Sequence, residues 1–238
     1  MVKLTVKRVL MDVDGTMTAA SDVHSMGKSP LRHLIDLVTA RHHLSAAEAE
    51  QRILHCGDPD IQCLSEFLPA LEIEPELYFD ALKEDLSRHI YIPKDTVYFL
   101  KTMRDRGIPV CAATTNSRFM TLAKLAVGGL ADINGSPYLA AYHPGCEFRD
   151  PAGKFSVHYF PNILKHHGYD PETTLMLGDE PEHDLYPALK AGIRYGVIVA
   201  RGQKEDLLRK DGGIFIRSLR ILAEMTVCGV DREKDRKG

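Results

Sequence analysis

The sequence lacks any apolar run long enough to cross a membrane. No stretch approaches the ~18 uninterrupted apolar residues that a membrane-spanning helix needs. Residues 1–8 form a charged, strand-like segment without the apolar core of a signal peptide. We therefore expect a cytoplasmic protein with no membrane partner.

The sequence also lacks a strong excess of charge of either sign. Its 30 basic and 33 acidic residues give a formal net charge of −3, and no basic stripe is interleaved with aromatic residues. Proteins that bind nucleic acids usually carry clustered positive charge. We therefore expect no nucleic-acid partner.

Cysteine is scarce, with five residues and no Cys-x-x-Cys pair. An odd and scattered set argues against a disulfide framework and against a structural zinc site. We expect all of them to be free thiols that mostly pack in the core, namely Cys56, Cys63, Cys111, Cys146 and Cys228.

What the sequence does contain is enough apolar surface for a large folded core, since 44% of its 238 residues are hydrophobic. Residues 6–11 resemble a first strand. Residues 27–90 then show helical spacing in about four segments, at 31–43, 45–56, 61–68 and 75–90, without a strand among them. The second of these segments opens with a capping box formed by Ser45 and Glu48.

After Pro93, helical segments alternate with short apolar strands at 108–114, 138–142, 173–179 and 195–200. Short strands separated by helices indicate a parallel sheet that is covered on both faces. We predict an α/β fold with a Rossmann-like parallel sheet core made of residues 1–16 and 94–238. An all-helical cap domain at 17–93 interrupts this core.

Charged and hydroxyl side chains follow several of the predicted strands. In an open parallel sheet, functional groups collect beyond the carboxyl ends of the strands. Several carboxylates that converge there repel one another unless a cation holds them, and Mg2+ is the natural hard cation for oxygen ligands. The side chains in question belong to Asp12, Asp14, Thr115, Asn116, Lys154, Asp179 and Asp184.

This combination of groups suits phosphoryl transfer. One carboxylate can attack phosphorus, and a neighbour two positions along the chain can carry the proton. A hydroxyl and an ammonium group then stabilise charge on the phosphoryl oxygens. Gly15 fits the sharp turn that must follow the first strand.

Four motifs, in this order, resemble those of the haloacid dehalogenase (HAD) superfamily. Residues 12–16 read DVDGT where that family has DxDGT, and Thr115 stands where it has a Ser or Thr at a strand end. Lys154 matches its third motif. Residues 178–192, GDEPEHDLYPALKAG, match the fourth. The sequence is similar to the phosphatase branch with a helical C1-type cap over residues 7–202.

The resemblance implies a role for each matching residue. Asp12 would be the nucleophile and a metal ligand, and Asp14 the general acid and base with its backbone carbonyl on the metal. Thr115, with Thr114 as the alternative, and Lys154 would hold the transferring phosphoryl group. The Mg2+ site would be completed by Asp179, while Asp184 would support Lys154 or the metal through water.

Asp14 also separates two activities within the superfamily, because its dehalogenases lack an aspartate at this position. The sequence departs from the usual pattern twice: Phe155 replaces a common Pro after the lysine, and Glu180 replaces a Ser in the fourth motif. The candidate substrate-binding residues are Asn116, His24 and Lys28, the last entering the first cap helix together with Arg32.

We therefore predict a Mg2+-dependent phosphatase that acts on a small phosphorylated metabolite through an aspartyl-phosphate on Asp12. One alternative is a phosphomutase that returns the phosphoryl group to a sugar phosphate. Another is a non-catalytic binding protein on the same fold. Substrate specificity lies in cap residues that follow no readable code, so the substrate stays open, as does the oligomeric state.

Overall fold

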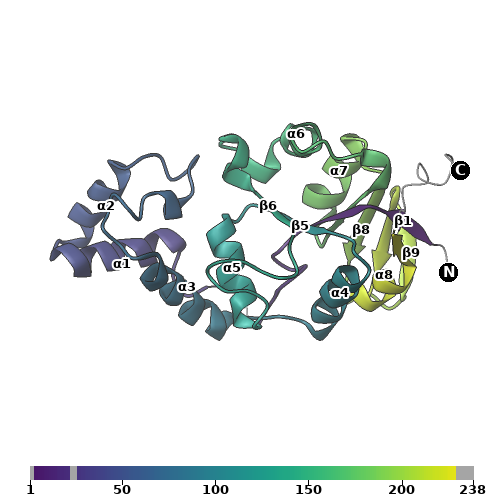
Figure 1. The fold of residues 1–238 in the computed structure, drawn as a ribbon, viewed down its shortest axis with the longest axis horizontal. Coiled ribbons are helices and arrows are strands. Elements are labelled where there is room, and N and C mark those ends of the chain that lie inside the picture. The colour runs from purple at the N-terminus through teal and green to yellow at the C-terminus, as the bar shows by residue number, and fades with distance from the viewer. Residues whose placement is uncertain (1–2, 22–25, 229–238) are drawn as a thin grey trace, which may run out of the picture.

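A seven-stranded sheet organises the protein in the computed structural model, which describes residues 3–21 and 26–228 (Figure 1). The strand order is β6-β5-β2-β7-β8-β10-β9, and adjacent strands run parallel except β9 and β10. The strands are β2 (Arg8–Met11), β5 (Val110–Thr114), β6 (Ala141–Pro144), β7 (Thr174–Gly178), β8 (Tyr195–Val199), β9 (Leu207–Lys210) and β10 (Gly213–Ile216).

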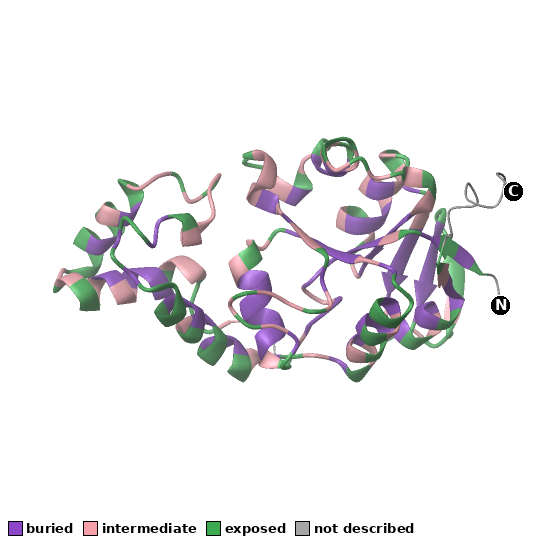
Figure 2. Ribbon diagram, in the orientation of Figure 1, coloured by how far each residue is buried: buried purple, intermediate pink, exposed green. Residues whose placement is uncertain are grey.

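The central strands are buried on both faces because helices cover the sheet from both sides (Figure 2). Side chains of β2 alternate: Val9 and Met11 pack in one apolar cluster, and Leu10 packs in another on the opposite face. Helices α4 (Lys94–Asp105) and α8 (Leu219–Met225) contribute to the first cluster, whereas α6 (Tyr159–His166) and α7 (Tyr186–Lys190) contribute to the second.

A separate group of helices lies to one side of the sheet (Figure 1). It consists of α1 (Pro30–His42), α2 (Ala46–Leu54), the short 3-10 turn η1 (Leu64–Glu66) and α3 (Pro75–His89). The predicted capping box is present, since the Ser45 hydroxyl accepts from the Glu48 amide and the Glu48 carboxylate accepts from the Ser45 amide. The helix expected at 61–68 was wrong, because only η1 forms there.

This group of helices meets the sheet domain at a pair of short strands, at a contact between two helices and at a disulfide that is described below. The chain leaves through β3 (Ala19–Ala20) and returns through β4 (Ile90–Tyr91), and these strands pair antiparallel. Helix α3 also packs on α5 (Arg118–Val127). There the ring of Phe119 lies 5.5 Å from Tyr78 and 5.4 Å from Phe79, centroid to centroid.

The predicted α/β fold with a mostly parallel sheet is confirmed. The strand expected at 138–142 begins later, at Ala141. The expectation that residues 17–93 are all-helical was wrong, because β3 and β4 lie within these bounds. The sequence interpretation also missed β9, β10 and α8, and a further small sheet in which β1 (Leu4–Val6) pairs with β11 (Thr226–Cys228). No helix in the described ranges combines the length and the apolar character that crossing a membrane requires.

The expectation of five free thiols was wrong, because Cys63 and Cys146 form a disulfide. Cys63 precedes η1 in the helical segment, and Cys146 lies in the 3-10 turn η2 (Gly145–Phe148) that follows β6. The two residues are 83 positions apart, and their Cα atoms lie 6.3 Å apart. Spacing rules that look for nearby cysteines cannot detect a pair that only the fold brings together.

This bond predicts a definite thiol count. Protein purified without reductant and then denatured should present three reactive thiols, those of Cys56, Cys111 and Cys228. Reduction should raise the count to five. A Cys63→Ser variant should present four without reduction, because Cys146 joins the three free residues, whereas Cys56→Ser should present two. Five thiols in the unreduced wild-type protein would contradict the bond.

Candidate active site

The loop after β2 turns sharply and brings Asp12 and Asp14 to the carboxyl end of the sheet. The Asp12 amide donates to the Leu177 carbonyl at 2.8 Å, which continues the pairing with β7 by one residue. Gly15 has φ +72°, and a Cβ built there would lie 1.9 Å from Asp179 Oδ2. The loop therefore needs glycine both for its backbone conformation and for space, as the sequence predicted.

Arg201, which the sequence interpretation did not single out, braces the same loop. Its guanidinium donates to the carbonyls of Gly15 at 2.6 Å and Thr16 at 2.9 Å. Thr96 Oγ1 donates to the Thr16 carbonyl as well, at 3.3 Å. Its position could have indicated a role, because Arg201 follows β8 at the same edge of the sheet.

The structure brings the predicted catalytic and metal-binding residues together around one cavity of about 200 Å³. Four of them come from the ends of β2 and β7 and the turn after β7, and the others follow β5 and β6. The lining residues are Asp12, Asp14, Thr115, Lys154, Phe155, Asp179, Glu180, His183 and Asp184.

Lys154 lies between two carboxylates at the floor of this site. It belongs to the 3-10 turn η3 (Gly153–Phe155) and is 4% exposed. Its ammonium donates to Asp12 Oδ1 and lies 2.6 Å from Asp184 Oδ1. Burial alone would lower the pKa of Lys154, but the two carboxylates outweigh burial and raise it, so the side chain is a cation.

Asp184 also fixes the turn after β7. Its Oδ2 accepts the backbone amides of Asp179 and Glu180, both at 3.1 Å. A Cβ on Gly178 would lie 2.0 Å from the same oxygen, so the strand must end in glycine for Asp184 to reach these amides. Asp184 is 1% exposed, and its position depends on this close approach.

The carboxylates of Asp12, Asp179 and Asp184 form a cluster whose oxygen atoms lie within 4.8 Å of one another. Burial raises the pKa of Asp12 to about 7, against the opposing charge of Lys154 and with repulsion from the other two carboxylates adding to it. Burial, followed by repulsion from Asp184, raises the pKa of Asp179 to about 6. One ammonium does not balance three carboxylates, and an all-oxygen donor set fits a hard divalent cation such as Mg2+.

Asp14 has a different environment from Asp12. Lys124, on α5 and 4% exposed, donates to its Oδ1 and Oδ2 at 2.6 and 2.7 Å. Asn116 Nδ2 donates to Oδ2 at 2.7 Å. Burial alone would raise the pKa of Asp14, but the Lys124 charge and these hydrogen bonds hold the pKa below its usual value. The two aspartates of the first motif are thus electrostatically distinct.

The two candidate threonines point to different surroundings. Thr114 is 2% exposed, and its Oγ1 accepts from the Asn116 side chain at 2.8 Å. Thr115 is exposed and lines the cavity that contains Asp12. Of the two, Thr115 therefore has the hydroxyl that a ligand in this cavity can reach.

A second cavity of about 340 Å³ opens beside the first, between the helical segment and the sheet domain. Thr115 and Phe155 line both cavities. Its other wall includes Gln62, Tyr78 and Leu82 of the helical segment, and both partners of the disulfide line it as well. A ligand that fills this space would contact both parts of the chain.

The predicted substrate-binding residues are not gathered at this cavity. Lys28 pairs with Asp36 at 2.8 Å and lines a separate surface cavity, away from Asp12. Asn116 lines the larger cavity, but its amide is engaged with Asp14, Thr114 and Lys124. His24 lies outside the described residues.

The two departures from the family pattern are accommodated. Phe155 is exposed, and its ring packs edge-on against His183 at 4.6 Å between centroids, while Lys154 beside it keeps its carboxylate partners. Glu180 pairs with His183 at 2.5 Å at the cavity wall.

Comparisons with known proteins agree with this architecture. A family model described as HAD-hydrolase-like matches residues 151–219. No curated protein matches the sequence. Among solved structures, a HAD phosphatase from Thermococcus onnurineus is similar with TM-score 0.54 at 22% identity, over 92% of this chain and 97% of its own.

Two further structures share the fold. The HAD-hydrolase YfnB from Bacillus subtilis, bound to magnesium, has TM-score 0.53 and 14% identity over 93% of this chain and 98% of its own. A dehalogenase with an intermediate complex has TM-score 0.55 and 14% identity, over 95% and 99% respectively.

These similarities confirm the resemblance that the motifs predicted. The matched segment contains Lys154, Asp179 and Asp184, three of the side chains around the cavity. The chain thus has the fold of these HAD-superfamily structures, and its segment 151–219 is similar to the HAD-hydrolase-like family.

The close approach at Gly178 gives a direct test of how the site is built. A Gly178→Ala variant should lose about 1–3 kcal/mol of unfolding free energy, because the added methyl displaces Asp184. Gly135→Ala is the matched control, since a Cβ there meets no atom within 4 Å, and it should change stability by less than about 0.5 kcal/mol. Urea denaturation measures both, and equal stabilities would contradict the packing described.

Proposed function

We propose that this protein is a Mg2+-dependent phosphatase that hydrolyses a small phosphorylated metabolite through an aspartyl-phosphate on Asp12. The observation that carries the proposal is the single cavity in which Asp12, Asp14, Thr115, Lys154 and a further pair of carboxylates meet. This is the set that phosphoryl transfer to a carboxylate requires: a nucleophile, a proton carrier, and donors for the phosphoryl oxygens.

Each side chain has a place in the proposed reaction. A carboxylate oxygen of Asp12 attacks phosphorus, the bond to the leaving oxygen breaks, and Asp14 gives that oxygen a proton. Asp14 then takes a proton from the water that attacks the phosphoryl group on Asp12. The bond between phosphorus and the Asp12 oxygen breaks, inorganic phosphate leaves, and Asp12 is restored as a carboxylate and Asp14 as the protonated acid. Lys124 stabilises the ionised form of Asp14 that accepts this second proton.

Thr115 and Lys154 would stabilise the negative charge on the phosphoryl oxygens. The exposed hydroxyl of Thr115 and the Lys154 ammonium border the position that phosphoryl oxygens would occupy. Mg2+, held by Asp12, Asp179 and the Asp14 carbonyl, with Asp184 supporting through Lys154 or water, would supply the positive charge that offsets the phosphate. The structural relative from Bacillus subtilis binds magnesium, which supports this choice of ion.

Residues 17–93 are proposed as a cap domain over a core of 1–16 and 94–238. The β3–β4 ribbon is the short connection about which such a cap would move once the Cys63–Cys146 bond, which ties it to the core, is reduced. The 340 Å³ cavity is the space that the cap would close. The magnesium-bound structure of YfnB from Bacillus subtilis reveals interdomain movement in that protein, which supports a mobile cap here. A cleft of this size favours a small metabolite as substrate.

A phosphate ester is favoured over a halogenated acid although a dehalogenase shares the fold. Asp14 lies in the cavity and is held by Lys124 and Asn116, so a proton carrier for an alkoxide leaving group is built into the site. A halide leaving group needs no proton.

The cytoplasmic location stays a prediction. The disulfide between Cys63 and Cys146 argues against it, because disulfides are uncommon in the cytosol.

Replacing the proposed nucleophile should abolish turnover. Asp12→Asn should lower hydrolysis of p-nitrophenyl phosphate in Mg2+ by at least about 1000-fold, because an amide cannot form the covalent intermediate. The exposed Asp80→Asn is the matched control and should retain wild-type rates. Chelation of Mg2+ with EDTA should abolish the activity of the wild-type enzyme, and added Mg2+ should restore it.

Two further measurements test the covalent intermediate and distinguish a phosphatase from a mutase. Acid-quenched wild-type enzyme should carry one phosphoryl group on the Asp12 peptide by mass spectrometry. Phosphorus NMR of sugar phosphates should show free phosphate, whereas an isomerised sugar phosphate would indicate a mutase. No hydrolysis across a metabolite panel, or halide release from a haloacid, would refute the phosphatase proposal.

Lys124 should act as a positioning residue for Asp14. Lys124→Met should lower kcat by about 10- to 100-fold while KM changes little, because Asp14 loses the cation that orients it. Lys124→Arg should restore part of the loss. Lys101→Met, at an exposed site on α4, is the control. An unchanged kcat in Lys124→Met, with normal folding, would show that Asp14 is oriented without this contact.

A further inference from the structure

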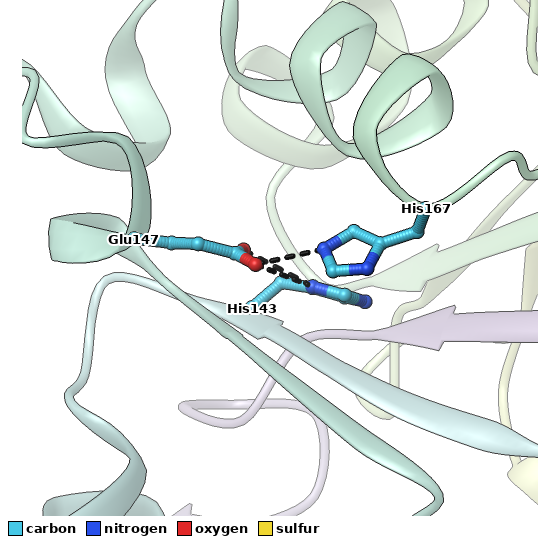
Figure 3. A group of neighbouring side chains, drawn as sticks. All are labelled: His143, Glu147 and His167. Atoms are coloured by element: carbon cyan, nitrogen blue, oxygen red, sulfur yellow. Dashed lines mark hydrogen bonds and ion pairs between the residues drawn. The ribbon is translucent and has the colours of Figure 1, made fainter.

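A cluster of two histidines and a glutamate lies outside the proposed active site. His143 is on β6, Glu147 is in η2, and His167 follows the last residue of α6. None of the three lines the cavity that contains Asp12. Figure 3 shows both imidazole rings facing the Glu147 carboxylate.

The distances bring three ligand atoms toward a common point. His143 Nδ1 lies 3.1 Å from Glu147 Oε2, and His167 Nε2 lies 2.8 Å from Glu147 Oε1. All three ligand atoms lie within 4.8 Å of one another. Ligands of a tetrahedral zinc ion with bonds near 2.0–2.2 Å are separated by roughly 3.4 Å, so small movements would suffice.

The charge of Glu147 is another reason to expect a cation here. Its side chain is 18% exposed, and within the described part of the chain it forms ion pairs with these two histidines and with no lysine or arginine. A mostly buried carboxylate is costly unless a positive charge accompanies it. A divalent ion bound between these three side chains would supply that charge.

The surroundings of His143 match those of a metal-bound histidine. The residue is fully buried, and its second nitrogen, Nε2, lies 3.2 Å from the Tyr169 hydroxyl. Metal-bound histidines commonly use the other ring nitrogen in such a hydrogen bond, which fixes the ring. Tyr169 is itself held by the Arg8 guanidinium, 3.6 Å above its ring.

We propose that His143, Glu147 and His167 form a zinc-binding site. Two imidazoles and one carboxylate are ligands that Zn2+ accepts, whereas Mg2+ prefers oxygen ligands. The side chain of His167 is 27% exposed, which leaves a path from solvent and room for water as a fourth ligand. The site is independent of the proposed phosphatase activity.

The proposed site would fasten the loop that carries the active-site lysine. Between Glu147 and His167 the chain passes through η3, which holds Lys154, and α6. The Tyr159 hydroxyl donates to the His143 carbonyl, which ties α6 to β6 behind the same loop. A bound ion would therefore join the contiguous elements β6 and η2 to the residue that follows α6, and so fix both ends of the segment that contains Lys154.

Metal counting on the purified full-length protein tests the proposal. Apo protein in excess Mg2+, which occupies the carboxylate cluster, should bind one equivalent of Zn2+ by equilibrium dialysis and elemental analysis. Co2+ in its place should give the visible absorption of a tetrahedral site. His167→Gln and Glu147→Gln should each weaken Zn2+ binding by more than about 100-fold. A residue that only hydrogen-bonds to a metal ligand typically contributes less, about 10- to 100-fold.

His166→Gln is the matched control, because His166 is the adjacent exposed histidine and is not a proposed ligand. It should retain the zinc equivalent and the cobalt spectrum. Asp179→Asn should retain both as well, which excludes the carboxylate cluster as the zinc site. Zn2+ should also raise the Tm of the wild type and of His166→Gln, but not of His167→Gln.

His167→Gln keeps the test independent of folding defects, because its side chain is the most exposed of the three. Equal zinc binding in His167→Gln and the wild type would overturn the proposal. So would the absence of bound zinc in the wild type, which would mean that hydrogen bonds alone hold the cluster.

Discussion

The contact of Lys154 with Asp12 and Asp184 is the interaction on which the site depends. It joins the end of β2, the turn after β7 and the loop after β6, and it is almost completely buried. Removing one partner of a buried ion pair typically costs about 3–5 kcal/mol, because the other charge stays in a poor environment. The three segments are therefore positioned jointly, and the cavity that they enclose exists only when all of them are in place.

The sequence could predict that these side chains lie near one another, because their placement follows from chain topology. Strands of a parallel sheet end at one edge, so Asp12, Thr115 and Asp179 had to meet there once their strands were recognised. The family motifs were needed to predict Lys154, because it lies in a loop that shows no periodic pattern in the sequence. Lys124 escaped notice because a lysine within an amphipathic helix resembles a surface residue, and only packing shows that α5 turns it toward Asp14.

Features that depend on long-range contacts could not be predicted from the sequence. The pair of Cys63 and Cys146 forms between parts of the chain whose relative placement no local pattern encodes. The cluster of His143, Glu147 and His167 has no recognisable metal-binding spacing, since the last ligand follows a complete helix. Strand β9 was missed for a different reason: it is an exposed, charged edge strand without apolar alternation.

The pairing of Ala20 with Ile90 means that the chain returns to almost the place where it left. To the sheet, everything between these residues is an insertion whose length does not alter the distance between its ends. Loop closure then costs little more for a longer insertion than for a shorter one. The helical segment can thus change in length and sequence without disturbing the register of β2 against its neighbours, provided that a cysteine at the position of Cys63 still reaches Cys146.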